Sequence, residues 1–139
     1  MIWVIDASVA LKWFLKDEFS ANADRVLHRV LSHSSEFAVP ELFAFEVLSV
    51  LARVTDDPER IYVNGVIPIL NSGILRFPVT EELVHKAIPY IGKGLTGYDA
   101  VYVALAEMLG GQWLTFDQKA HKKISRLKRS LCLKQRCPV

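Results

Sequence analysis

Residues 1–14, MIWVIDASVALKWF, are almost wholly apolar but contain one acidic residue, Asp6. Residues 2–5 are apolar and include β-branched side chains, which predicts a short buried strand. The apolar residues of segment 8–15 recur with helical spacing, which predicts a helix directly after that strand. Asp6 would then lie at the carboxyl end of a buried strand, where its carboxylate can stay in contact with solvent.

The rest of the chain repeats this order of a strand followed by helices. We expect further strands over residues 36–39, 74–79 and 112–116, and helices over residues 20–34, 40–54, 57–73, 80–92, 96–111 and 117–127. The expected N-caps include Ser20, Asp57 and Thr80. Pro40 suits the first turn of its helix. Gly65, Pro68 and Pro89 weaken or kink the helices that contain them, and residues 130–139 receive no element. This alternation predicts an α/β fold, namely a three-layer α/β/α arrangement with a central, mainly parallel sheet.

The composition predicts a single compact domain over residues 1–139, because 51% of the residues are hydrophobic and the chain has the usual length of one domain. The longest apolar stretch, residues 37–52, contains two glutamates and a proline and is shorter than the ~20 residues of a membrane span. Residues 2–15 lack the flanks of a secretory signal, so we expect a cytoplasmic protein with no membrane segment. Cys132 and Cys137 are expected to be free thiols, and the four histidines form no pattern typical of a metal site.

Positive charge is concentrated at the end of the chain. Of the 17 Lys and Arg residues, eight lie in residues 118–139, which contain no acid. The preceding 117 residues carry the other nine against 15 Asp and Glu, a net charge of −6. The eight cations are Lys119, Lys122, Lys123, Arg126, Lys128, Arg129, Lys134 and Arg136. Two interpretations stay open: these cations neutralise the phosphates of an RNA backbone, or they form a solvated helix face.

Four acids stand at positions where a shared site is expected: Asp6, Glu46, Asp99 and Asp117. Each also has an ordinary explanation. Asp6 can be a turn residue, Asp117 can cap a helix, and Glu46 can pair with Arg53 or lie at a solvated edge. Asp99 can form a capping box with Thr96. Their joint placement favours one site, because two of them follow strands that end at the same edge of the sheet and two lie on helices that can flank this edge.

Four carboxylates in one place repel each other and raise each other's pKa values, so such a site requires a cation. Oxygen ligands without His or Cys are typical of Mg²⁺ or Mn²⁺, which also bind the phosphates of a substrate. These ions activate water and neutralise the charge that develops on a phosphodiester. The chemistry that this set of acids predicts is therefore phosphodiester hydrolysis.

Four stretches resemble the signature blocks of PIN-domain ribonucleases: VIDASV, PELFAFEVLSVL, TGYDAVYVALAE and WLTFDQKAH. In order, spacing and length, the chain is most similar to the VapC-like toxins of type II toxin–antitoxin systems. The resemblance implies a parallel sheet with helices on both sides and an endoribonuclease that depends on Mg²⁺ or Mn²⁺. The positions that match the family's metal-binding and catalytic acids are Asp6, Glu46, Asp99 and Asp117, and those that match its supporting polar residues are Ser8 and Thr115.

The partners that this resemblance implies are an RNA substrate, a cognate antitoxin that occupies a groove near the site, and a second copy of the chain in a homodimer. Ser8 and Thr115 also have ordinary interpretations, as a helix N-cap and a strand-end hydroxyl. The tryptophans and tyrosines are expected in the core rather than against nucleic-acid bases. The alternative function is a non-catalytic PIN-like module that binds RNA or protein.

Overall fold

A five-stranded parallel sheet forms the centre of the computed structural model, which describes residues 1–139. The strands are β1 (Trp3–Ile5), β2 (Phe37–Pro40), β3 (Leu75–Phe77), β4 (Gln112–Thr115) and β5 (Ser130–Cys132). Their order across the sheet is β3-β2-β1-β4-β5, which places β1 in the centre. In the register of the sheet, Val4 lies opposite Ala38 of β2 and Trp113 of β4. The predicted α/β fold with a parallel sheet is confirmed.

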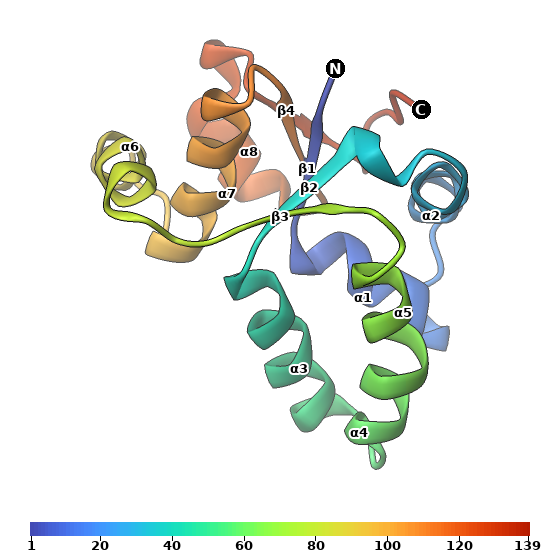
Figure 1. Ribbon diagram of the computed structural model, residues 1–139. Helices are drawn as coiled ribbons and strands as arrows, with labels where there is room; N and C mark the ends of the chain where they lie inside the picture. Colours follow the sequence, from blue (N-terminus) through green and yellow to red (C-terminus); the bar gives the residue numbers. More distant parts are fainter.

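Helices cover both faces of this sheet. The first set is α1 (Ala7–Phe14), α2 (Ala21–Ser32), α3 (Leu42–Val54), α4 (Pro58–Ile61) and α5 (Ile67–Leu70), and the second is α6 (Glu81–Gly92), α7 (Gly97–Met108) and α8 (Gln118–Ile124). Short helical turns η1 (Lys16–Glu18), η2 (Ser34–Glu36), η3 (Tyr62–Val66) and η4 (Ser125–Leu127) connect them. Figure 1 shows α7 and α8 on one side of the sheet and α1 and α2 on the other, with α6 packed outside α7. No helix has both the length and the apolar character that a membrane span requires.

Polar side chains begin most of these helices by accepting a backbone N–H of the first turn, which satisfies donors that the helix itself leaves free. The N-caps of this kind are Asp6, Ser20, Asp57, Thr80, Thr96 and Asp117. The predicted caps Ser20, Asp57 and Thr80 are thereby confirmed. Local sequence therefore sets where each of these helices starts.

The helical segments around residues 40 and 57–73 differ in part from the prediction. Pro40 is the last residue of β2, and α3 begins only at Leu42, because Pro40 continues the pairing with β3. The helix expected over residues 57–73 extends from Pro58 to Leu70, and the π-helical turn η3 interrupts its α-helical hydrogen-bond pattern between α4 and α5. Pro68 lacks an N–H and would crowd the carbonyl four residues before it, and the wider π turn accommodates it. Gly65 lies in this turn, where an added Cβ would be 2.5 Å from the ring of Phe14.

The helix expected over residues 80–92 is confirmed, because α6 continues through Pro89 to Gly92. Pro89 and His85, whose carbonyl loses its helical partner, both lie on the exposed side of the helix, where water can replace that partner. Ser130–Cys132 forms β5, an edge strand that the sequence analysis did not assign. This strand has only three residues and lies between Lys- and Arg-rich stretches, which is usual for the edge of a sheet.

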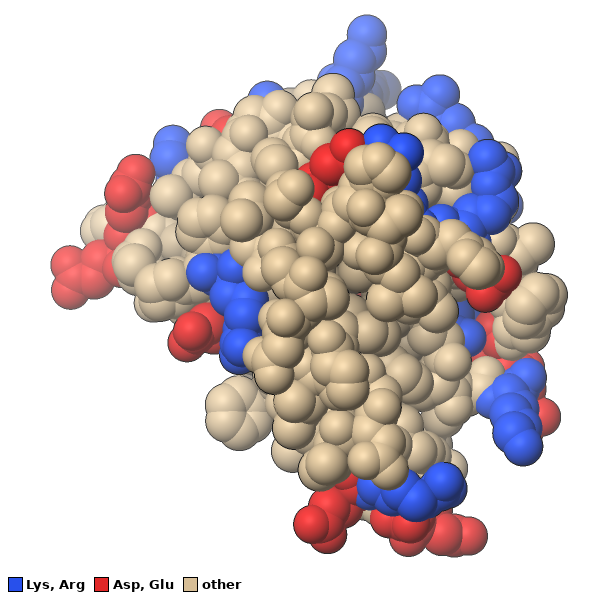
Figure 2. Space-filling model, turned by 45° about the vertical axis from the view of Figure 1, so that its right-hand side comes forward, with Lys and Arg blue, Asp and Glu red and all other residues tan.

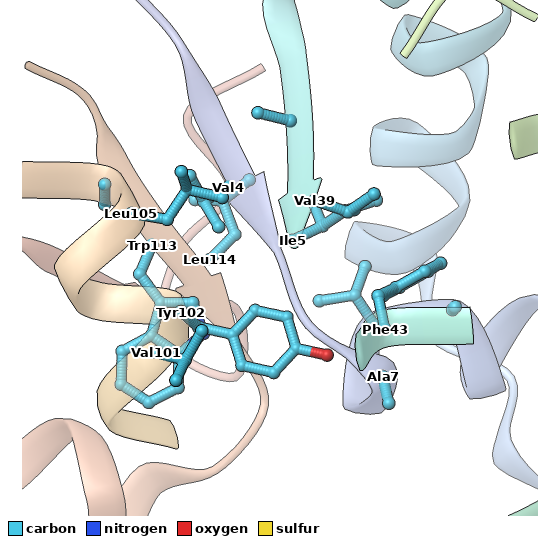
Figure 3. Close-up of a cluster of buried hydrophobic side chains, with 14 of the residues drawn as sticks. Val4, Ile5, Ala7, Val39, Phe43, Val101, Tyr102, Leu105, Trp113 and Leu114 are labelled. Carbon is cyan, nitrogen blue, oxygen red and sulfur yellow. The ribbon is translucent and has the colours of Figure 1, made fainter. Parts of the chain in front are cut away.

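One part of the hydrophobic core lies where α7 packs against the sheet. Residues 100–106 of α7 are all buried, which explains why this helix is apolar nearly all round. Figure 3 shows Val101, Tyr102 and Leu105 of α7 beside Val4 and Trp113 of the sheet. This packing holds the first turn of α7 close to the carboxyl end of β1, where Asp6 lies.

Candidate active site

The four predicted acids lie around the carboxyl edge of the sheet. Asp6 directly follows β1, and Asp117 follows the neighbouring strand β4 after one intervening residue. Glu46 lies in the second turn of α3, which follows β2, and Asp99 lies in the first turn of α7. Since β2, β1 and β4 are adjacent and parallel, the segments that follow them meet at one edge. The fold thereby brings acids from four separate parts of the sequence into one region.

Asp6 is the most deeply buried of these acids, with 5% of its surface exposed. Its Oδ1 accepts hydrogen bonds from the Ser8 hydroxyl and from the Val9 backbone N–H at 3.3 Å. Its Oδ2 accepts a hydrogen bond from Trp113 Nε1 at 3.0 Å. Burial raises the pKa of Asp6 to about 6, although the hydrogen bonds from Ser8 and Trp113 and the nearby Thr115 hydroxyl act in the opposite direction. Asp6 is thus the N-cap of α1 and also a fixed, buried carboxylate with a raised pKa.

Ser8 and Thr115 connect the start of α1 to the end of β4. The Ser8 hydroxyl donates to Asp6 and accepts the Phe116 backbone N–H at 3.0 Å. Thr115 is fully buried, its Oγ1 lies 3.4 Å from the Ser8 hydroxyl, and it accepts the backbone N–H of Asp117 at 3.0 Å. Ser8 is therefore not a helix N-cap. These two hydroxyls instead hold the backbones that carry Asp6 and Asp117 in a fixed arrangement.

Asp99 and Asp117 form the more accessible side of the site. Asp117 is exposed and accepts the Ala120 backbone N–H at 2.9 Å, so it caps α8. Asp99 is partly buried, and its backbone N–H donates to the Thr96 hydroxyl at 3.2 Å. Burial and then the charge of Asp117 raise the pKa of Asp99, while Thr96 and Lys123 lower it. Asp99 and Asp117 are therefore close enough for their charges to interact.

Glu46 is partly buried and has none of the partners that would make it an ordinary surface acid. It forms no salt bridge with Arg53, and its Oε1 is buried without any hydrogen bond. The pKa of Glu46 is raised to about 7, first by burial and then by the charges of Asp6 and Asp99, while the nearby Tyr102 hydroxyl acts in the opposite direction. A buried carboxylate oxygen without a partner lowers the free energy of unfolding. A hydrogen-bond donor or a cation next to Glu46 would compensate for this loss.

Tyr102 is a site residue that the sequence analysis placed only in the core. Its ring is buried, but Figure 3 shows its hydroxyl directed away from α7 toward Ala7 and Phe43, near the starts of α1 and α3. The hydroxyl is close enough to Glu46 to influence its pKa, yet the two form no hydrogen bond of good geometry. Burial and the charge of Glu46 raise the pKa of Tyr102 well above its usual value. The hydroxyl therefore stays protonated and is available as a donor.

Trp113 is a second residue whose role was missed. Its ring belongs to the core, but its N–H holds Asp6. The sequence contains a signal for this: Trp113 is two residues before Thr115, so both side chains project from the same face of β4. That signal becomes useful only when the order of the strands places β4 beside β1.

The charges of the four acids influence one another along a chain of neighbours. Asp6 acts on Glu46, Asp99 acts on Asp6 and Glu46, and Asp117 acts on Asp99. No three Asp, Glu, His or Cys side chains are grouped closely enough to ligate a single metal ion. The structure thus gathers the predicted acids at one edge without arranging them as a closed shell of ligands. The structure shows four carboxylates near this edge, and the pKa values of Asp6, Glu46 and Asp99 are raised.

Comparisons with known proteins agree with this arrangement. The PIN domain family matches residues 3–127 of the chain. Ribonuclease VapC3 of Pyrobaculum aerophilum is 29% identical over 131 residues, which cover 89% of this chain and 95% of that protein. The solved structure of PAE2754 from Pyrobaculum aerophilum has a TM-score of 0.69 at 18% identity, covering 97% of this chain and 91% of that chain. A toxin–antitoxin complex from Klebsiella pneumoniae has a TM-score of 0.69 at 11% identity, covering 94% of this chain and 96% of that chain. These findings confirm the resemblance inferred from the sequence blocks, and the chain belongs to the PIN domain family.

Proposed function

We propose that this protein is an endoribonuclease that depends on Mg²⁺ or Mn²⁺ and acts as the toxin of a toxin–antitoxin pair. The observation that carries the proposal is the gathering of four distant acids at one edge of a PIN-domain sheet. We assign the metal-binding and catalytic roles to Asp6, Glu46, Asp99 and Asp117. The similarity to a ribonuclease over 89% of the chain supports this assignment.

The side chains at the site fit a hard divalent cation. Their donor atoms are carboxylate oxygens, with no His or Cys among them, which favours Mg²⁺ or Mn²⁺ over softer metals. The buried Glu46 Oε1 lacks any hydrogen-bond partner, and a cation would compensate it. Burial, and to a smaller extent mutual repulsion, raises the pKa of Asp6, Glu46 and Asp99, and a cation would offset both effects. Such an ion would neutralise charge on the phosphodiester and make a water molecule more acidic.

The chain itself supplies the orientation of this site. The Trp113 N–H and the Ser8 hydroxyl hold the Asp6 carboxylate from two sides, so it loses little freedom when it binds a ligand. The contacts of Ser8 and Thr115 with the backbones of Phe116 and Asp117 keep the end of β4 against the start of α1. We therefore assign positioning roles to Ser8 and Thr115, and add Trp113 to them.

We propose three partners for the protein: an RNA substrate, a cognate antitoxin and a second copy of the chain in a homodimer. The antitoxin is supported by the similarity of the fold to the toxin–antitoxin complex from Klebsiella pneumoniae. Sequencing the neighbouring open reading frame tests this directly, because toxins of this kind are expected beside a small antitoxin gene.

RNA cleavage by the purified protein tests the proposed activity. With Mg²⁺ or Mn²⁺ the protein should cut a structured RNA, whereas Asp6→Asn and Asp99→Asn should not. Asp56→Asn is a matched control, since Asp56 is exposed and forms no hydrogen bond or ion pair. Equal cutting by the two site variants refutes the assigned site. Absence of cutting together with absence of calorimetric metal binding instead supports a non-catalytic binding module.

A further inference from the structure

The cations at the end of the chain are not distributed evenly around the molecule. In the view of Figure 2 the charged side chains lie mostly around the periphery, and the middle of that face is uncharged. Two cations of α8, Lys119 and Lys123, line a hollow that also contains Asp99 and Asp117. Positive charge therefore lies directly beside the two most accessible acids of the site.

A second hollow continues from the first. Lys123 lines both, and the second hollow is also lined by Lys93, Lys122 and Arg126, with no acid among its residues. Lys93, Lys122 and Arg126 are exposed, and their side chains form no ion pair. This end of the molecule therefore presents cations that nothing within the protein neutralises.

A third hollow is also lined by Asp117. Its lining includes Ser8, Lys134, Lys12 and Glu18, and the last two form a salt bridge in which Lys12 Nζ lies 3.5 Å from a Glu18 carboxylate oxygen. Lys12 lies over the ring of Phe116, with its Nζ 5.2 Å from the ring centre. Asp117 thus lines two hollows that both contain unpaired lysines, the first with Lys119 and Lys123 and the third with Lys134.

Lys123 is fixed at the junction of the first two hollows. Its ammonium group donates a hydrogen bond to the Gly94 carbonyl at 2.8 Å, in the segment between α6 and α7. Gly94 has a φ of +100°, and an added Cβ would lie 3.4 Å from the Lys123 side chain. Because the carbonyl accepts only one of the three ammonium protons, Lys123 can still donate to a phosphate that lies next to Asp99.

We infer that these three hollows form one cationic track for an RNA strand, which passes Asp99 and Asp117. The track residues are Lys93, Lys119, Lys122, Lys123, Arg126 and Lys134. A polynucleotide suits this row because its charges repeat along one chain, as the cations do. The inference rests on the proposed function for the acids that line the hollows, and it names the residues that position the substrate.

The remaining cations of the tail lie elsewhere. Lys128 and Arg136 line a different hollow together with Met1 and Trp3, at the amino end of β1 and away from the acids. Arg129 donates to the Gly111 carbonyl at 3.0 Å. The track therefore uses five of the eight tail cations and adds Lys93, which is distant from them in sequence.

Equilibrium binding of a fluorescein-labelled single-stranded RNA tests the track without requiring cleavage. Binding is measured in the Asp99→Asn background with Mg²⁺, at several salt concentrations between about 50 and 200 mM. Combining Lys122→Ala with Arg126→Ala should weaken binding at low salt and reduce the slope of log K against log salt by about 1.4, since each phosphate contact contributes about 0.7. The matched control combines Arg25→Ala with Arg136→Ala, which removes two exposed cations outside the three hollows and should leave the slope unchanged.

Lys122→Arg with Arg126→Lys retains both charges and should restore the slope, while thermal melting checks that every variant is folded. Equal losses in the track pair and the control pair, or an unchanged slope in the track pair, overturn the inference. Polyglutamate that binds these residues more tightly than RNA also overturns it in favour of an acidic protein segment. Because cleavage is not measured, failure of the proposed catalysis and failure of the track give separate results.

Discussion

The buried Asp6 carboxylate should make the stability of the metal-free protein fall as the pH rises. Burial raises its pKa from the ordinary 3.8 to about 6 in the folded protein. Between these values the folded protein binds a proton that the unfolded chain has released, so the unfolding free energy decreases with increasing pH. Asp6→Asn cannot ionise, so it removes this part of the pH dependence.

The Asp6→Asn substitution separates two contributions of Asp6 to the unfolding free energy, that of its charge and that of its hydrogen bonds. The asparagine oxygen can accept from Ser8 and Val9, but its amide group then faces the Trp113 N–H, donor against donor, at a cost of about 1–3 kcal/mol that does not depend on pH. The charge contribution does depend on pH, and the shift in pKa amounts to about 2–3 kcal/mol between pH 4 and pH 7. Relative to the unsubstituted protein, the unfolding free energy of Asp6→Asn should therefore increase by about 2–3 kcal/mol from pH 4 to pH 7.

Urea unfolding at a series of pH values, followed by circular dichroism in the presence of a chelator, measures this difference. Asp56→Asn serves as the control, because it removes a carboxylate from an exposed position that has no ion pair. The reasoning is refuted if the difference for Asp6→Asn stays constant within about 0.5 kcal/mol or moves in the opposite direction, since changes of that size are usual for neutral surface substitutions.

Three further outcomes are expected. Millimolar Mg²⁺ or Mn²⁺ should raise the melting temperature in differential scanning fluorimetry, and less so in Asp99→Asn, since a ligand at 100 times its dissociation constant adds about 2.7 kcal/mol. Trp113→Phe should lower the unfolding free energy by about 2–4 kcal/mol in urea, because it removes the donor to Asp6 and leaves a cavity. Tyr102→Phe should change stability by no more than about 1 kcal/mol in the same assay, because the hydroxyl that it removes has no hydrogen-bond partner.

Local patterns in the sequence were sufficient for most of the secondary structure. The caps Ser20, Asp57 and Thr80 begin their helices where expected, because capping depends on a side chain and the backbone three residues later. Pro40 was placed wrongly, because a proline suits a first helical turn and the end of a strand equally well. Which of these it occupies is decided by pairing with β3, a contact between residues almost 40 positions apart.

Contacts between residues that are distant in sequence also decide the formation of β5 and the hydrogen bonds of the site. Ser130–Cys132 is recognisable as a strand only from its register with Trp113–Thr115, because three residues carry too little periodicity. The bond from Trp113 to Asp6 likewise depends on β4 lying beside β1. The types of residue at the site could be read from the sequence, but the contacts that orient them depend on the order of the strands.

Capping of a helix and binding of a metal ion are not competing explanations for Asp6 and Asp117, because a carboxylate has two oxygens. Asp117 uses Oδ1 to cap α8, which leaves its other oxygen without a protein hydrogen bond. Asp6 uses Oδ1 for the cap and Ser8, and its Oδ2 receives only the Trp113 N–H and retains one lone pair. The cap thereby fixes the direction of each carboxylate while leaving it an acceptor for a cation. Asp6 and Asp117 can therefore begin a helix and serve the proposed site at the same time. For this reason the local sequence around these two acids could not distinguish a cap from a metal ligand.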